Sequence, residues 1–178
     1  MAKHIVTLIA LLISGMAAFA QMSRTPKELN MLDNEISRKH IYDNSKYNRI
    51  AKLSEESYSS AKYSARRYHA SIQLAKEYET FKSDSALYYF NQAYHIAEEL
   101  NDSSKITLAK LGRIKVLAIL GYFKESMTEL DEIEAQGVPE ELKAEWLDTS
   151  RQLYAYVTTY AIDNEFLFNR YLKKLNYY

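Results

Sequence analysis

Two stretches, ALYYFNQA at residues 86–93 and SMTELDEI at residues 126–133, carry the pattern that decides the fold. The same small, large, small-or-apolar series occurs in each, forty residues apart, as Ala86, Phe90, Ala93 and as Ser126, Leu130, Ile133. Spacings of four and three place each trio on one face of a helix. A lone helical hairpin cannot bury such a face, so the fixed period predicts hairpins stacked against one another.

The rest of the sequence fits an all-α chain. Only 4 Gly and 2 Pro occur in 178 residues, too few turn formers for a many-stranded sheet. Apolar spacing predicts helices at residues 57–81, 85–100, 103–120, 123–136, 139–161 and 163–178. Apolar residues surround almost the whole helix at 103–120, which predicts that it is the buried centre of the stack. Ser103 or Ser104 is placed to cap it, and Asp163 to cap the last helix.

The first twenty residues are typical of a cleavable export signal. Lys3 and His4 precede nine apolar residues at positions 5–13, and Ala18-Phe19-Ala20 offers the small residues that a signal peptidase needs. Nine residues are too few to cross a bilayer core, which takes about 20. We therefore expect cleavage after Ala20, export to the periplasm, and no membrane span in the mature chain.

A long amino-terminal helix is expected over residues 21–56, ahead of a helical-repeat domain at 57–178. Thr25-Pro26-Lys27-Glu28 is a helix start, with Pro at the first helical position and Glu three residues after the cap. Charged residues interrupt the heptad seam that follows, so the helix either packs loosely on the body or pairs with another chain. The residues predicted to mediate such a homo-oligomer are Leu29, Leu32, Ile36, Ile50 and Leu53.

Composition argues against several kinds of function. The formal net charge is zero, which gives no field to attract nucleic acid or an anionic membrane. The absence of Cys removes thiolate catalysis and cysteine metal sites. His95 lies three residues before Glu98, but no second His stands four residues away, so a surface pair is favoured over a metal ligand. We therefore expect that the protein is not an enzyme and that it has no catalytic residue, no metal site and no cofactor.

The sixteen tyrosines suggest a second use of the helices, because Tyr offers rigid contact area with a polar tip. Solenoids tend to bind ligands on their concave side. Either helix packing or a ligand groove explains these side chains at this stage. The groove candidates are Tyr68, Tyr78, Arg113, Lys115, Arg151 and Tyr154.

The hairpin signature resembles the tetratricopeptide repeat, with Leu74 and Ile114 standing where that repeat has Gly. A second likeness comes from DSALYY at 84–89, LGR at 111–113 and GYFKES at 121–126. With the upstream helix, these resemble the exported half of tetratricopeptide-type transcriptional regulators of the Bacteroides group. In that family, periplasmic repeats precede a membrane span and a DNA-binding end, neither of which occurs in this sequence.

The resemblance implies a TPR-like α-solenoid that acts as a periplasmic sensing or protein-interaction module of a regulator or signalling system. The expected partner is a protein or peptide, and no nucleic acid is expected to bind through this chain. The alternative is a structural scaffold or oligomerisation module that works through the amino-terminal helix.

Overall fold

The computed structural model describes residues 25–178, and every described element is helical. The elements are α2 (Thr25–Ser37), α3 (Lys39–Ser59), α4 (Ala65–Glu79), α5 (Ser83–Glu99), α6 (Ser103–Ile119), α7 (Phe123–Gln136), η1 (Glu140–Leu142), α8 (Lys143–Tyr160) and α9 (Glu165–Tyr177). The predicted export signal lies outside the described residues. Of the described helices, none is both long and apolar enough to cross a membrane. The all-α prediction is confirmed.

Backbone contacts divide the chain into a unit that ends at Tyr47 and a unit of residues 48–178. In the first unit, the expected long helix is present but interrupted by a turn at Arg38. The Ser37 hydroxyl donates to the carbonyl of Asp33 at 2.8 Å, and the Arg38 amide bonds to both Asn34 and Glu35 carbonyls. Such local bonds from Ser compete with the regular helix ladder. The predicted boundary between residues 56 and 57 stays a prediction, and that position lies within α3.

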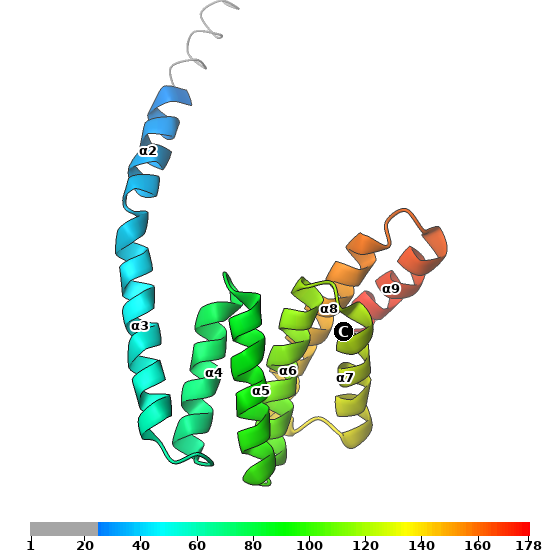
Figure 1. Ribbon diagram of the computed structural model, residues 1–178. Helices are drawn as coiled ribbons and strands as arrows, with labels where there is room; N and C mark the ends of the chain where they lie inside the picture. The colour runs from blue at the N-terminus through cyan, green and yellow to red at the C-terminus, as the bar shows by residue number, and fades with distance from the viewer. Residues whose placement is uncertain (1–24) are drawn as a thin grey trace, which may run out of the picture. The chain divides into compact units, whose positions relative to one another are not determined.

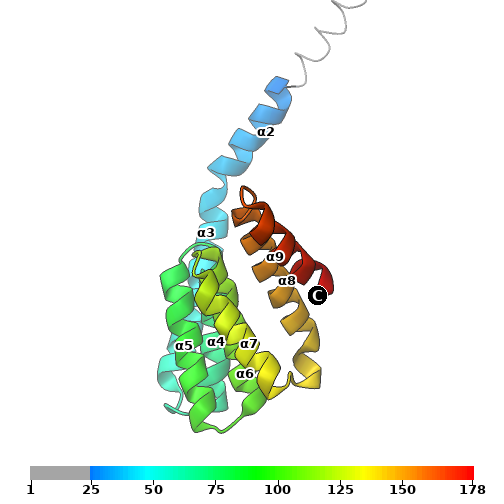
Figure 2. The same ribbon diagram turned by 90° about the vertical axis from the view of Figure 1, so that its right-hand side faces the viewer.

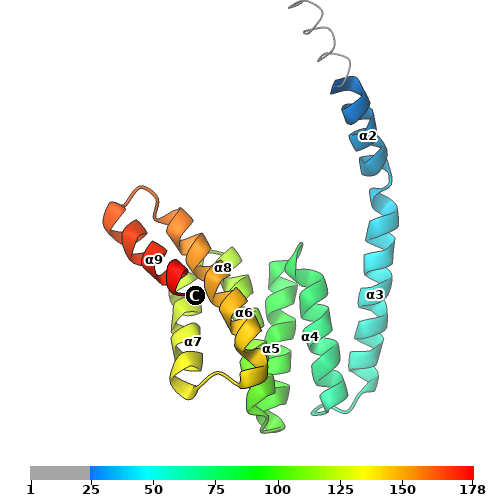
Figure 3. The ribbon, with the colours of Figure 1, turned by 180° about the vertical axis from the view of Figure 1, so that it is seen from behind.

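The second unit contains the hairpins α4–α5, α6–α7 and α8–α9. Figure 1 shows α4, α5 and α6 running side by side. Helix α8 lies against α6 when the unit is seen from behind (Figure 3), and α9 returns along α8 (Figure 2). Contacts of α6 with α4 and with α8 place the first helices of the hairpins in one layer. This is the TPR-like stack that the sequence predicted.

Helix α6 is the centre of the stack, as predicted, because two hydrophobic cores share it. Ala109 and Val116 on one face pack with residues of α4 and α5. Leu111, Ile114 and Ala118 on the other face pack with residues of α7 and α8. The trios that decided the fold are buried, with exposed fractions of 0–2% at Ala86, Phe90, Ala93, Ser126, Leu130 and Ile133. A helix covered on opposite sides needs apolar residues around most of its circumference, which explains the composition of α6.

Several helix ends differ from the prediction. Helix α3 continues to Ser59 and α4 begins only at Ala65, where the sequence pattern predicted one helix from Ser57 or Ser60. The Ser64 hydroxyl accepts from the Arg67 amide at 3.2 Å and so caps α4. The caps of α6 and α9 are Asp102 and Asn164, each one position away from the predicted residue or pair.

Candidate functional site

The six predicted groove residues differ in their exposure and in their contacts. Tyr68 and Tyr154 are 1% and 4% exposed and pack in the interior, and their assignment to a ligand groove stays a prediction. The Tyr68 hydroxyl donates to the carbonyl of Lys105 at 2.9 Å, which ties α4 to α6. The ring of Tyr154 stacks on Tyr178 with centroids 5.5 Å apart. Apolar burial of a ring together with a hydrogen bond from its tip is an ordinary core role for Tyr.

Arg113 and Tyr78 also serve packing. The Arg113 guanidinium donates to the Glu129 carboxylate at 2.7 Å and lies 5.4 Å from the centre of the Tyr94 ring. Burial raises the pKa of Glu129, and the opposing fields of Arg113 and Lys110 do not cancel that effect. Tyr78 stacks between Phe81 and Tyr89, at centroid distances of 5.4 and 5.7 Å.

Lys115 and Arg151 complete the predicted groove set, and their role in binding also stays a prediction. Arg151 is exposed on α8. The Lys115 ammonium donates to Glu145 at 2.7 Å and to Asp148 at 2.9 Å, both on α8. Burial opposes its charge, but these two bonds more than compensate and raise the pKa of Lys115. The bonds fix α6 against α8.

A small polar cavity of about 150 Å³ lies in the layer of α4, α6 and α8. Lys76 and Glu79 of α4 face Lys115 of α6 and Glu145 of α8 across it. Burial raises the pKa of Glu79, against the fields of the two lysines. Lys115 pairs with Glu145 here, and the fields of Lys115 and Lys76 act on Glu79, so this cavity links three helices and its two cations and two carboxylates balance in number.

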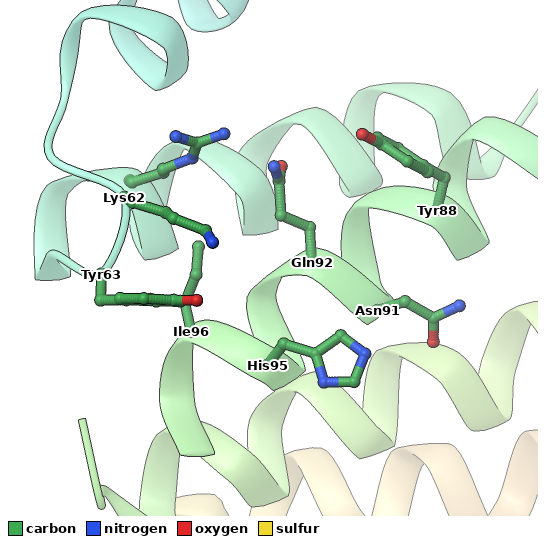
Figure 4. A pocket seen from close by; sticks show the side chains of 8 residues that line it. Lys62, Tyr63, Tyr88, Asn91, Gln92, His95 and Ile96 are labelled. Carbon is green, nitrogen blue, oxygen red and sulfur yellow. The ribbon is translucent and has the colours of Figure 1, made fainter. Parts of the chain in front are cut away.

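A second cavity, of about 400 Å³, lies between the loop before α4 and helix α5. Figure 4 shows Lys62 and Tyr63 from the loop on one side and the α5 side chains on the other. Among the described residues, no carboxylate lines this cavity. Its lining consists of Lys62, Tyr63, Arg67, Tyr88, Asn91, Gln92, His95 and Ile96. A surface cavity with cations, amides and rings is a candidate binding site.

The cations of this cavity keep their charge accessible. Lys62 holds its ammonium 4.8 Å from the centre of the Tyr63 ring, and a hydrogen bond with the Tyr63 hydroxyl raises the pKa of Lys62. Among residues 25–178, no ion pair joins a carboxylate to Lys62 or Arg67. His95 meets Glu98 at 3.1 Å, the surface pair that the sequence predicted. The cavity can therefore hold an anion by charge.

None of the eight lining residues was predicted to form the ligand groove, and His95 was interpreted only as part of a surface pair. The sequence pattern placed Lys62 and Tyr63 inside the predicted helix at residues 57–81. One signal was present in the sequence: two arginines, at positions 66 and 67, follow Ser64, and cations in a first helical turn oppose the helix dipole. Only the fold shows that Arg67 and α5 share a cavity.

Comparison with known protein families matches residues 36–178 to the family described as the SusR N-terminal TPR domain. Separate comparisons with curated proteins and with solved structures give no match. The match spans α4 to α9 and the helix before them, which is the region built from stacked hairpins. Domains of the tetratricopeptide type are generally non-catalytic repeat modules that mediate protein interactions. The chain therefore belongs to the family of the SusR N-terminal TPR domain.

Proposed function

We propose that this chain is an exported sensing module, which recognises a protein or peptide partner in the periplasm on behalf of a transcriptional regulator or signalling system. The observation that carries the proposal is the match of residues 36–178 to the SusR N-terminal TPR domain. The predicted export signal at residues 1–20 supports the location. No cofactor takes part, because recognition rests on shape and charge.

The shared helix α6 supplies a route for sensing. Because one core joins α6 to α4 and α5 and the other joins it to α7 and α8, a partner that contacts both hairpins senses their relative packing. A partner that binds one packing more tightly than another shifts the population toward it. The response is then carried by the arrangement of helices and needs no chemical step.

Export is tested by the mass of the protein in the source organism. We expect the periplasmic fraction to contain a chain that begins at Gln21, with residues 1–20 removed. Replacing two residues of the apolar run, Leu11 and Leu12, with Lys should keep the uncleaved chain in the cytoplasm. An intact amino terminus in the cytoplasm of wild-type cells contradicts the proposed location.

Recognition is tested by site-specific photo-crosslinking in the same cells. A photoreactive residue at exposed Arg151 on α8, or at exposed Tyr88, beside the cavity of α5, should yield a discrete adduct. The same residue at Lys39 in the first unit is the control. The purified partner must then bind the purified chain. Failure of every adduct to reproduce as a purified complex contradicts the proposal.

Self-association through the first unit is a second candidate, favoured by exposed apolar residues. Leu29, Leu32 and Ile36 are 54%, 55% and 60% exposed. The rest of the predicted oligomer set does not share this property, because Ile50 is 7% exposed and Leu53 is half-buried. We expect the double substitution Leu32→Glu and Ile36→Glu to abolish any dimer in sedimentation equilibrium, whereas Gln73→Glu on α4 leaves it intact. A dimer unaffected by the double substitution excludes this role for α2.

A further inference from the structure

We infer that the cavity between the loop before α4 and helix α5 binds an acidic peptide segment, in which a carboxylate side chain is followed or preceded by an apolar one. This inference rests on the proposed function, since it names the chemistry of the protein or peptide partner. It places recognition on residues of the α4–α5 hairpin that are not among the six predicted groove residues.

Two unpaired cations define the charge of the ligand. Arg67 lies in the cavity, while its neighbour Arg66 points to Glu56 and forms an ion pair with it at 2.9 Å. Arg67 sits in the first turn of α4, where the helix dipole disfavours positive charge. A cation in this position, with no ion pair among the described residues, does not stabilise the helix. It is therefore a better candidate for contacting a ligand than for stabilising the fold. Together with Lys62, which also lines the cavity, it makes the cavity attractive to a carboxylate.

The nearest acidic side chains do not neutralise these cations by direct contact. Glu98 accepts hydrogen bonds from Tyr94 and His95, which lower its pKa and hold the carboxylate on the α5 surface. The field of Glu99 reaches Lys62. Within residues 25–178, neither carboxylate lines the cavity. The positive charge inside the cavity is therefore left for a ligand.

The side-chain amides indicate a peptide in preference to a simple anion. The Ser71 hydroxyl donates to the side-chain oxygen of Gln92 at 3.1 Å and so restrains this amide, which lines the cavity. Asn91 adds a second amide, which both donates and accepts hydrogen bonds. Inorganic phosphate and sulfate offer acceptors to such groups, whereas a peptide backbone offers donors and acceptors in alternation.

Apolar groups beside the amides specify the neighbour of the acidic residue. Ile96, which is 3% exposed, forms part of the lining together with the rings of Tyr63 and Tyr88, which are 46% and 61% exposed. Rings that already lie partly in water gain contact area when an apolar side chain covers them. A cavity of about 400 Å³ has room for a carboxylate side chain and one such neighbour, at the lower end of ordinary ligand pockets.

The test uses the protein expressed from its full sequence and two synthetic pools of pentapeptides, acetylated and amidated at their ends. One pool has Glu at the centre and the other Gln, with the four flanking positions randomised. Affinity selection and mass spectrometry should retain peptides from the Glu pool with an apolar residue next to the centre. For the best peptide, we expect Arg67→Ala and Lys62→Ala each to weaken binding about tenfold or more. The matched control, Arg66→Ala, should change affinity less than twofold.

Four results would overturn the inference. They are equal retention of the two pools, unchanged binding by Arg67→Ala with a native circular dichroism spectrum, equal loss in Arg66→Ala and Arg67→Ala, and full displacement of the peptide by an equimolar amount of inorganic phosphate. Conservative Arg67→Lys guards against misfolding, because it keeps the charge and should retain part of the affinity. If a crosslinked partner binds the Arg67→Ala protein normally, the cavity is excluded and the proposed function stands. If no partner binds at all, the proposed function fails too.

Discussion

Gly112 is the position where the stack is most sensitive to a single added carbon. It lies buried on α6, facing the ring of Phe90 on α5. A Cβ atom at residue 112 would lie 2.1, 2.4 and 2.6 Å from three ring carbons of Phe90. Nonbonded carbon atoms normally approach to about 3.5–4.0 Å. The substitution Gly112→Ala therefore forces the ring or the helix to move by roughly 1.5 Å.

Two opposing effects set the size of the change. Ala in a helix interior is more favourable than Gly by about 1 kcal/mol. Overpacking of a filled core costs about 1–3 kcal/mol, and here the ring is 2% exposed among Ala86 and Ala93 and has little room to retreat. Taking the upper end of that range, we expect Gly112→Ala to lower the free energy of unfolding by about 2 kcal/mol. The corresponding fall in melting temperature is about 4–8 °C for a domain of this size.

Urea unfolding followed by far-ultraviolet circular dichroism measures this change, with the fluorescence of Trp146 as a second probe. The sharper measurement is a double-mutant cycle with Phe90→Leu, which removes the ring edge. In that background, Gly112→Ala should be neutral or stabilising by up to about 1 kcal/mol, because only the helix preference remains. The two changes then couple strongly.

Wild-type stability, or a gain in stability, in Gly112→Ala alone would contradict this expectation. Additive effects of the two substitutions would contradict it as well, because the close approach of α6 to the Phe90 ring is expected to couple the two positions. Either result would mean that the ring finds another position at little cost and that the register of the hairpins does not depend on this contact.

Substitutions at three further positions test the packing by the same unfolding measurement. Tyr68→Phe should cost about 1 kcal/mol, since it removes the hydrogen bond to Lys105. Burial raises the pKa of Tyr68, so the wild type should lose stability as the pH rises above about 10 and this variant should lose less. Arg113→Ala should cost about 2 kcal/mol, because it leaves the carboxylate of Glu129 unpaired at 15% exposure. Ser126→Ala should cost less than about 1 kcal/mol, whereas Ser126→Leu should overpack the core and cost about 1–3 kcal/mol.

Arg113→Ala has a matched control variant. Arg38→Ala breaks an ion pair with Glu35 in which both side chains are more than half exposed, and it should change stability by less than about 0.5 kcal/mol. A loss in Arg113→Ala no greater than in Arg38→Ala contradicts the importance of burial. If the wild type and Tyr68→Phe lose the same stability as the pH rises above about 10, the role given to the Tyr68 hydroxyl is contradicted. Toleration of Ser126→Leu would contradict the buried register of α7.

Periodicity was enough to predict the stack, because burial and helical spacing are local properties of a sequence. Phe90 and Leu130 sit at the same place in their hairpins and both are buried, as the forty-residue repeat predicted. Helix ends were less certain, since several adjacent polar residues can cap the same helix. Asp102 caps α6, although Ser103 and Ser104 carry similar oxygens one and two positions later.

The predicted groove shows where local reasoning ends. Spacing identified Tyr68 and Arg113 as side chains on inner helices, but it could not determine whether their tips meet water or another helix. Tyr68 meets the backbone of α6, and Arg113 meets Glu129 on α7. The cavity of α5 was missed for the same reason, because its cations and its amides come from segments separated by about one helix, and no motif links them.

By itself, the sequence determined the helical class, the hairpin period, the central place of α6 and the likeness to tetratricopeptide regulators. Which polar side chains pair with each other, which remain open, and where Gly112 lets two helices approach depend on how the helices pack in space. Helix formation and burial depend on residues a few positions apart, which the chain displays directly. The pairing of charges across hairpins depends on distances between helix faces, and those exist only once the helices are packed.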